Sequence, residues 1–302
     1  DTDSGVPLEQ KVDASIPVTW TSEPAYDMDA EGVYVFTPVI DRYTLIADLP
    51  EITVTIGAPM MKMGLLAAGA PIDISAMTVA QMKSAIETEL NKPTVTSVTV
   101  TGNKTSVTET LELNIPAGKK VLWGATISTS IHLFALIKLS GGGVFESTGY
   151  ITAATGTAIE GVSADVSVVI SGGTVRNYCA DTSVKYSVIS MPIAPTDASA
   201  VNVTVRGNGS IYSVTGSAIF SKGSVVISGS ASLSVAGGDA IYMRGTSGGR
   251  STLTIEGGSV TSTSDPGKAI DAEYCDITIS GTATVSSVRQ NFSYGWATIT
   301  GT

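Results

Sequence analysis

The sequence is poor in the side chains from which catalytic sites are built. Its 302 residues include one histidine, His132, and nowhere do two aspartates stand side by side. Polysaccharide hydrolases use two or three acidic side chains close together, and lyases use an acidic cluster for calcium with an Arg or Lys as base. Neither arrangement is visible, and His132 stands between Ile131 and Leu133 in a strand pattern. We therefore assign no catalytic residue, no metal site and no cofactor.

Long hydrophobic runs and paired cysteines are also missing. The apolar stretch from Met60 to Pro71 is too short to cross a membrane and contains Lys62, so we expect no membrane insertion. The chain has two cysteines, Cys179 and Cys275, which occupy unrelated positions of the repeat described below. Two cysteines so placed are expected to be separate thiols.

Charge is scarce and unevenly distributed. Charged residues make up 15% of the chain, and the formal net charge is −10. Residues 1–56 hold eleven Asp and Glu side chains against Lys11 and Arg42, so nearly all of the net charge belongs to the N-terminal part. No basic stripe is available for phosphate contacts, which argues against nucleic acid as a partner. Low charge with abundant Gly, Ser and Thr favours an extracellular β protein.

What the sequence does contain is an imperfect repeat of two short phrases. The phrase Gly-x-Ala-Ile ends at Ile159, Ile219, Ile241 and Ile270. A strand-like phrase such as Val-Val-Ile-Ser-Gly places Ile170, Val205, Ile227, Ile255 and Ile279 at equivalent positions. The steps between these five are 35, 22, 28 and 24 residues. A period near 22 residues indicates stacked units that contact only their neighbours.

The repeat predicts a right-handed parallel β-helix over residues 94–302. Its phrases are short, β-branched and alternating, and turn dipeptides separate them without room for helices. We expect about three strands and three turns per coil, with inward Ile, Val, Ala and Leu ladders and with glycines at corners of positive φ. The 35-residue step contains Tyr178 to Ala200, which we interpret as a loop thrown out of one rung.

One amphipathic helix precedes the solenoid, within a linker assigned to residues 58–93. Thr78 and Gln81 form a capping box, and Val79, Met82, Ile86 and Leu90 recur at helical spacing before the stop at Asn91. We predict that this helix covers the open end of the first rung, whose strand edges would otherwise pair with other molecules. A helix that binds a partner is the alternative.

Residues 1–57 are assigned to a small acidic β module. Strands are predicted over residues 16–21, 32–39 and 52–56, with Pro24, Pro38 and Pro50 between them. Over residues 18–54, from Val18-Thr19-Trp20 through Gly32-Val33-Tyr34 to Ile52-Thr53-Val54, the sequence resembles the bacterial Ig-like repeat of modular surface proteins in Gram-positive gut bacteria. The resemblance implies an Ig-like module followed by a pectin-lyase-like β-helix. It also implies a place on the cell surface.

An acidic stretch in this module has a weak likeness to a calcium loop. Asp27-Met28-Asp29-Ala30-Glu31-Gly32 matches the opening of an EF-hand loop except for Glu at the fifth position. The twelfth position is Pro38, where a bidentate Glu is required, and a strand pattern follows where a helix should stand. We interpret the stretch as an acidic turn.

The residue after each Gly-x-Ala-Ile phrase points outward if the isoleucine points inward. This column contains Glu160, Phe220, Tyr242 and Asp271, and two residues further along stand Lys222, Arg244 and Glu273. An exposed aromatic pair flanked by charges is a surface on which a sugar ring can stack. The candidate glycan-binding residues are therefore Phe220, Tyr242, Arg244, Asp271 and Glu273. The alternative is an aromatic ladder that only shields strand backbone.

These features favour a non-catalytic, monomeric cell-surface module for adhesion or for binding a polysaccharide or host glycan, presented on a rigid rod. Two alternatives stay open. One is a polysaccharide lyase or glycoside hydrolase, because many parallel β-helices are such enzymes, although a fold alone cannot carry that assignment. The other is a purely structural stalk.

Overall fold

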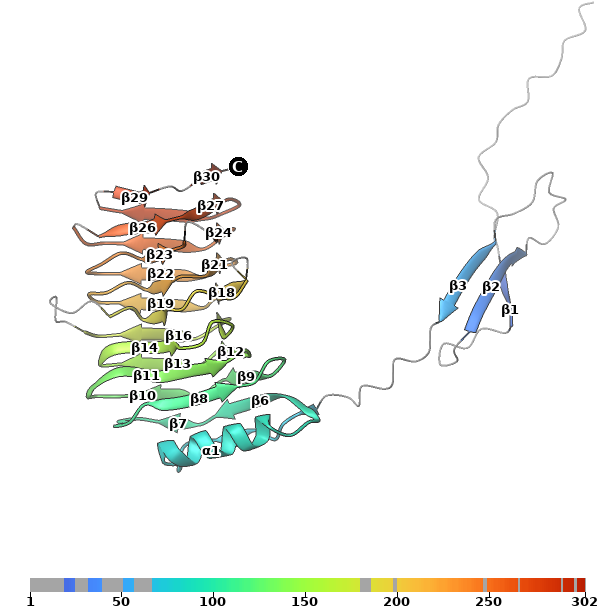
Figure 1. Ribbon diagram of the computed structural model, residues 1–302, viewed down its shortest axis with the longest axis horizontal. Coiled ribbons are helices and arrows are strands. Elements are labelled where there is room, and N and C mark those ends of the chain that lie inside the picture. Colours follow the sequence, from blue (N-terminus) through green and yellow to red (C-terminus); the bar gives the residue numbers. More distant parts are fainter. Residues whose placement is uncertain are drawn as a thin grey trace, which may run out of the picture. The chain divides into compact units, whose positions relative to one another are not determined.

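The computed structural model describes residues 19–24, 32–39, 51–56, 67–179, 186–197, 200–246, 249–265, 267–288, 290–295 and 298–301. The chain divides into two compact units, Asp1–Leu65 and Leu66–Thr302. The first contains a small antiparallel sheet and the second contains a solenoid (Figure 1).

The first unit holds three antiparallel strands, β1 (Thr19–Glu23), β2 (Gly32–Val39) and β3 (Ile52–Ile56), in the order β1-β2-β3. The three predicted strands are thus confirmed, while residues 16–18 and residues 27–31 of the acidic stretch lie outside the described residues. Alternation along the strands places Trp20, Tyr34 and Phe36 on one face, and Tyr34 is buried. A three-stranded sheet is common to many folds, so the Ig-like assignment stays a prediction.

The second unit is a parallel β-helix of about nine turns, as predicted, in which the chain visits three sheets in rotation. The first sheet contains β4 (Ala67–Ala68), β5 (Ile72–Asp73), β6 (Val95–Thr101), β9 (Lys120–Trp123), β12 (Val144–Ser147), β15 (Ser167–Ile170), β18 (Val201–Val205), β21 (Ser224–Ile227), β24 (Ser251–Ile255), β27 (Cys275–Ile279) and β30 (Thr298–Gly301). The second contains β7 (Asn103–Lys104), β10 (Thr126–Ser128), β13 (Tyr150–Ala153), β16 (Thr174–Asn177), β19 (Ser210–Ser213), β22 (Ser232–Val235), β25 (Ser259–Ser262) and β28 (Thr284–Ser287). The third contains β8 (Leu111–Ile115), β11 (His132–Gly141), β14 (Thr155–Gly161), β17 (Ile189–Met191), β20 (Ile219–Ser221), β23 (Ile241–Arg244), β26 (Lys268–Glu273) and β29 (Gln290–Gly295).

Each of the two repeated phrases falls on one sheet of the β-helix. The Gly-x-Ala-Ile phrases belong to the third sheet, where Ile219, Ile241 and Ile270 stand in register. The second phrase belongs to the first sheet, where Ile170, Val205, Ile227, Ile255 and Ile279 form one continuous column. Four of these five are completely buried, and they belong to a single apolar core that fills the coil.

The prediction that Tyr178 to Ala200 form a loop thrown out of one rung is wrong in part, because this stretch contains β17, the third-sheet strand of that rung. Strand β17 pairs with β14 on one side and with β20 on the other, and Ile189 stands in the isoleucine column between Ile159 and Ile219. The sequence Val188-Ile189-Ser190 has no Gly-x-Ala in front of it, which hid the strand from the repeat. Extra residues therefore enter at the corners, while the ladder is preserved.

Two columns of glycine have different physical causes. Glycines that follow the first-sheet strands, among them Gly207, Gly229 and Gly281, have φ between 60° and 67°, which the corner prediction anticipated. The glycine of the Gly-x-Ala-Ile phrase is needed for another reason. A Cβ at Gly216 would lie 1.8 Å from the carbonyl oxygen of Tyr186, and one at Gly238 would lie 2.8 Å from the carbonyl oxygen of Gly216. There the backbones of successive rungs approach too closely for any side chain.

The predicted capping helix is present as α1 (Val79–Leu90) and lies across one end of the solenoid (Figure 1). Thr78 and Gln81 form the capping box, and Met82, Ile86 and Leu90 are completely buried against β6 and β8. This helix of twelve residues is too short to cross a membrane, and no other helix occurs in the described part of the chain.

Polar side chains of α1 also satisfy the backbone of β8, the terminal strand of the third sheet. Lys83 Nζ donates to the carbonyl oxygen of Glu112 at 3.0 Å, and Glu87 Oε1 accepts from the N–H of Asn114 at 2.8 Å. These are the backbone groups that an uncovered edge strand would offer to another molecule. The helix thus closes this end both by apolar burial and by hydrogen bonding.

Replacing both Met82 and Ile86 by Asp should uncover this end of the solenoid. Each buried side chain contributes about 1.5–3 kcal/mol, so we expect a loss of at least about 3 kcal/mol in unfolding free energy, with self-association through the exposed edge. Chemical denaturation and size-exclusion chromatography measure the two effects. The matched control is Ser84→Asp with Thr88→Asp, which adds the same charge to exposed positions of the same helix. Equal stability and monomeric elution for both pairs would contradict a capping role.

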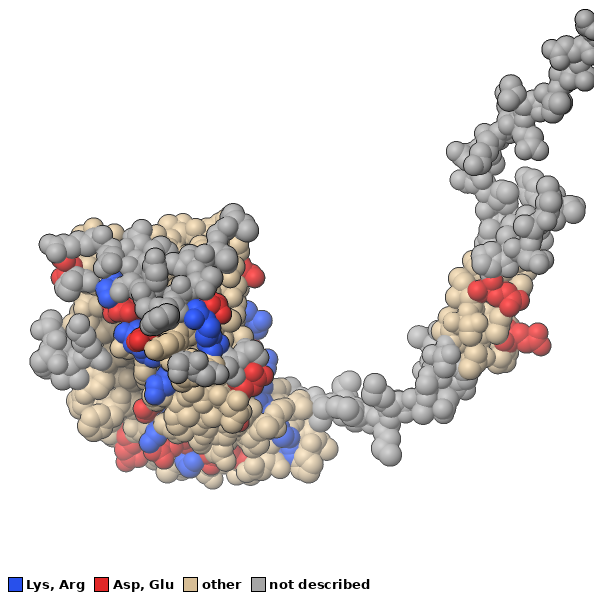
Figure 2. Space-filling model, turned by 45° about the horizontal axis from the view of Figure 1, so that its top comes forward, with Lys and Arg blue, Asp and Glu red and all other residues tan. Residues whose placement is uncertain are grey.

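Ion pairs on the outer surface run from rung to rung. Basic and acidic side chains lie interspersed over the upper part of the solenoid face in view (Figure 2). On the first sheet, Glu146 lies 2.9 Å from Lys120 Nζ and 2.8 Å from Arg206 Nη2. Burial of Glu146 raises the pKa of its carboxyl, but hydrogen bonds from Arg206, Lys120 and Ser171 outweigh it and lower the pKa to about 2. The triad links three separate rungs.

The triad should make stability depend on pH in a defined window. The pKa of Glu146 is lowered on folding from 4.5 to about 2, so the unfolded chain binds the extra proton first and the stabilisation is lost as pH falls through this range. We expect Glu146→Gln to be less stable than wild type by about 2 kcal/mol at pH 7, allowing for solvent screening of Lys120 and Arg206. The difference should shrink below pH 4.5 and vanish near pH 2 in denaturation curves. A difference independent of pH would refute the ion triad.

Candidate functional site

The candidate residues lie on the outer face of the third sheet. Its central outward column contains, in register from β11 to β26, Lys138, Glu160, Ser190, Phe220, Tyr242 and Asp271. Ser190 of β17 therefore stands between Glu160 and Phe220, a neighbour that the repeat did not indicate. Phe220 and Tyr242 are direct neighbours on successive rungs, as predicted, whereas Glu160 is two rungs from Phe220.

The two aromatic rings form a stack that continues into Arg244. The ring centroids of Phe220 and Tyr242 are 5.3 Å apart with an interplanar angle of 32°, and Arg244 Cζ lies 4.0 Å from the centroid of Tyr242. Phe220 belongs to the preceding rung, and the carboxylates that bind Arg244 belong to the following one. Tyr242 is thus covered from both directions along the solenoid axis, and both rings are half-buried rather than exposed as predicted.

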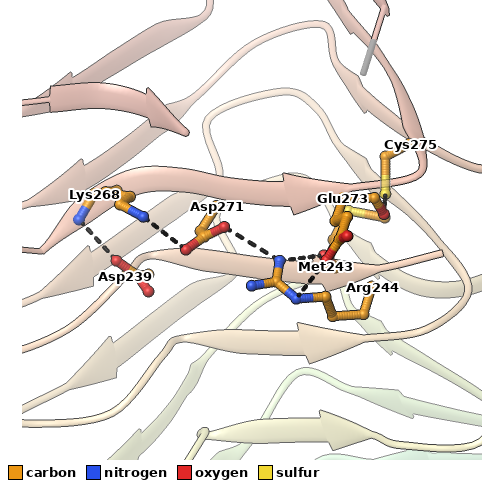
Figure 3. A network of polar contacts seen from close by, with 7 residues as sticks. All are labelled: Asp239, Met243, Arg244, Lys268, Asp271, Glu273 and Cys275. Atoms are coloured by element: carbon orange, nitrogen blue, oxygen red, sulfur yellow. Dashed lines mark hydrogen bonds and ion pairs between the residues drawn. The ribbon is translucent and has the colours of Figure 1, made fainter. Parts of the chain in front are cut away.

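The charged members of the candidate site pair with one another (Figure 3). Arg244 Nη1 lies 3.1 Å from Asp271 Oδ1, and Arg244 Nε lies 3.6 Å from Glu273 Oε2. Lys268 Nζ binds the second oxygen of Asp271 at 2.9 Å. The backbone N–H of Lys268 donates to Asp239 Oδ1 at 2.9 Å and so fixes the Asp239 carboxylate. The charges therefore hold β23 and β26 together and orient Tyr242 through Arg244.

A hollow of about 370 Å³ opens beside the aromatic stack and is lined by Ser187, Ser217, Phe220, Asp239 and Tyr242. Of the five candidate residues, only Phe220 and Tyr242 line it. Arg244, Asp271 and Glu273 do not line it, and they form the ion-pair network that supports the stack. On the side of Phe220 away from Tyr242, the neighbouring position of the column holds the small Ser190.

Three residues of the hollow were missed by the sequence analysis, although a signal for two of them was present. Ser217 and Asp239 occupy the variable position of the Gly-x-Ala-Ile phrase. This position lies two residues before the inward isoleucine and just ahead of the strand, so strand alternation does not predict its direction, and both side chains line the hollow. Ser187 takes the same place before Ile189, but no glycine or alanine marks it.

The histidine and the two cysteines discussed in the sequence analysis lie outside this site. His132 is exposed at the start of β11, and its Nδ1 lies 2.9 Å from Thr155 Oγ1. Cys179 and Cys275 are both buried and are not joined by a disulfide bond, as expected, and burial raises the pKa of Cys275. No three His, Cys, Asp or Glu side chains come together as a metal site within the described ranges.

No known protein family, curated protein or solved structure matches this chain. What the hollow can bind therefore follows from its own side chains. It offers two half-buried aromatic rings, two serine side chains and one carboxylate whose position is fixed by a backbone hydrogen bond. A ligand with an apolar face and a rim of hydroxyl groups matches this set.

Removing Arg244 should loosen the stack and not unfold the protein. Arg244→Gln loses the ion pairs to Asp271 and Glu273 and the contact with Tyr242, and we expect a loss of about 1–2 kcal/mol in unfolding free energy. Lys222→Gln is the matched control, since Lys222 occupies the same outward column on the preceding rung. Its effect should stay within about 0.5 kcal/mol. Equal stabilities of the two variants would show that the network does not support the stack.

Proposed function

We propose that this chain is a non-catalytic carbohydrate-binding module of a cell-surface protein, and that a glycan binds in the hollow beside Phe220. The observation that carries this proposal is that the stacked rings of Phe220 and Tyr242 line one hollow together with two serines and Asp239. Tyr242 and Arg244 fix the orientation of the Phe220 ring. A ring whose position is set before binding loses little freedom when a ligand arrives.

The surroundings of Phe220 suit a sugar. A pyranose ring presents C–H groups on its faces and hydroxyl groups around its rim, so it can stack on Phe220 while its rim meets Ser187, Ser217 and Asp239. Asp239 Oδ1 is occupied by the N–H of Lys268, and Oδ2 makes no hydrogen bond within the described part of the chain. That oxygen is available to accept a hydrogen bond from a sugar hydroxyl group. The volume of the hollow is in the range of small-molecule sites.

The lining residues also indicate how a glycan chain would lie. Ser187 comes from the rung of β17, Ser217 and Phe220 from that of β20, and Asp239 and Tyr242 from that of β23. A ligand that contacts all of them therefore runs along the solenoid axis. The carboxylates of Asp271 and Glu273 pair with Lys268 and Arg244 and do not converge on the hollow, which favours binding over hydrolysis.

A glycan array probed with multivalent protein tests this proposal. One site of this kind is weak, so several copies per particle are needed for a signal. Phe220→Ala should lower the signal by a factor of about five or more, because it removes the stacking face. Tyr212→Ala is the matched control, a half-buried outward tyrosine on the second sheet.

Two outcomes would overturn the proposal. Equal signals from wild type and Phe220→Ala, at equal thermal stability, would leave the stack as a structural ladder and favour a stalk. Release of reducing ends or unsaturated products from glycans by the wild-type protein would replace it with the enzymatic alternative.

A further inference from the structure

Phe134 of β11 is exposed on the outer face of the third sheet, beside a β-bulge. His132 pairs with Thr155 and Ala135 pairs with Thr157, so three steps on β11 match two on β14. Phe134 lies between these two pairs and is 77% exposed, although the strand continues with the buried Ala135. Bulges of this kind redirect a side chain at the cost of regular pairing, and they are frequent next to functional sites.

Phe134 is accompanied by two aromatic residues that carry polar groups. The ring of His132 packs edge-on against Phe134 with centroids 5.4 Å apart, and the ring of Tyr186 lies 5.6 Å from His132. His132 Nδ1 lies 2.9 Å from Thr155 Oγ1, and His132 Nε2 lies 3.5 Å from the Tyr186 hydroxyl. The cluster thus combines one open apolar plane with hydroxyl and imidazole groups at its rim.

Tyr186 joins this cluster to the hollow. It belongs to the rung of β17 and reaches back across the rung of β14 to His132 on β11. The next residue in the chain, Ser187, lines the hollow. Polar and aromatic groups therefore continue along one edge from Phe134 to Phe220.

We propose that Phe134, His132 and Tyr186 form a second sugar-binding platform, which engages the same glycan chain as the hollow. This inference rests on the proposed function and adds the length and direction of the ligand. The rungs of β11 and β20 are three steps apart, or about 14 Å at a strand spacing of about 4.8 Å. An extended β-linked chain advances by close to one sugar residue per rung, so an oligosaccharide of about four or five residues reaches both platforms.

A sugar fits this platform better than a protein partner does. A stable protein interface covers about 800 Å² on each side and is built around a buried apolar centre. Here one phenyl ring provides the open plane, and its neighbours His132, Thr155 and Tyr186 are polar or carry a polar tip. Stacking on one ring with a few hydrogen bonds at its edge is the contact that a pyranose makes.

The test compares short and long probes by calorimetry. The probes are β-1,4-linked gluco-, xylo- and manno-oligosaccharides, each as a disaccharide and as a hexasaccharide. Wild type should bind the hexasaccharide of at least one series about five to ten times more tightly than the disaccharide of that series. Only the longer probe can stack on Phe220 and on Phe134 at the same time. Phe134→Ala should remove this preference and leave disaccharide affinity unchanged. Phe134→Tyr should retain it, since the aromatic plane is kept.

Two control variants separate the outcomes. Tyr150→Ala removes an aromatic side chain that is 55% exposed on the second sheet, and it should behave as wild type. Phe220→Ala should weaken both probe lengths. Wild-type affinity of Phe134→Ala for the hexasaccharide would overturn the second platform and leave the hollow intact. Failure of wild type to bind any of the probes would overturn the platform together with the function on which it rests.

Discussion

The structure depends on parallel pairing of each strand with the equivalent strand of the next rung. Such pairing stacks residues of equal position above one another at the strand spacing, so each side chain packs against the side chain at the equivalent position of the next rung. Inside the coil this produces columns of Ile and Val without polar interruptions, as from Ile170 to Ile255. At one corner it brings backbones so close that only glycine fits, as at Gly216 and Gly238.

The same pairing governs the outer surface, where interactions run along the axis. Lys120, Glu146 and Arg206 come from three different rungs, and Arg244 on β23 binds Asp271 on β26. The stack of Phe220 on Tyr242 is the aromatic counterpart of these pairs. A binding surface on this fold is therefore naturally a strip. The residues of such a strip are far apart in the sequence but lie on adjacent rungs of the solenoid.

The sequence was sufficient for most of the fold because the repeat and the helix carry strong local signals. The capping box at Thr78 and the buried spacing of Met82, Ile86 and Leu90 are encoded within a few residues. The stack of Phe220 on Tyr242 followed from the phase of Gly-x-Ala-Ile. Ser190 was missed because β17 lacks that phrase, and Phe134 was missed because β11 also lacks it and contains a bulge that the sequence does not mark.

The glycines of the Gly-x-Ala-Ile phrase occupy positions that cannot change, whereas other positions of the same sheet can. A substitution at Gly216 or Gly238 meets the backbone of the preceding rung, whereas the outward column of the third sheet accepts serine, phenylalanine, tyrosine and aspartate on successive rungs. Surface substitutions of that second kind usually change unfolding free energy by no more than about 0.5 kcal/mol. The scaffold can thus acquire, lose or exchange a ligand by point mutation while its folding is left nearly untouched. In evolutionary terms, recognition on this face can drift faster than architecture.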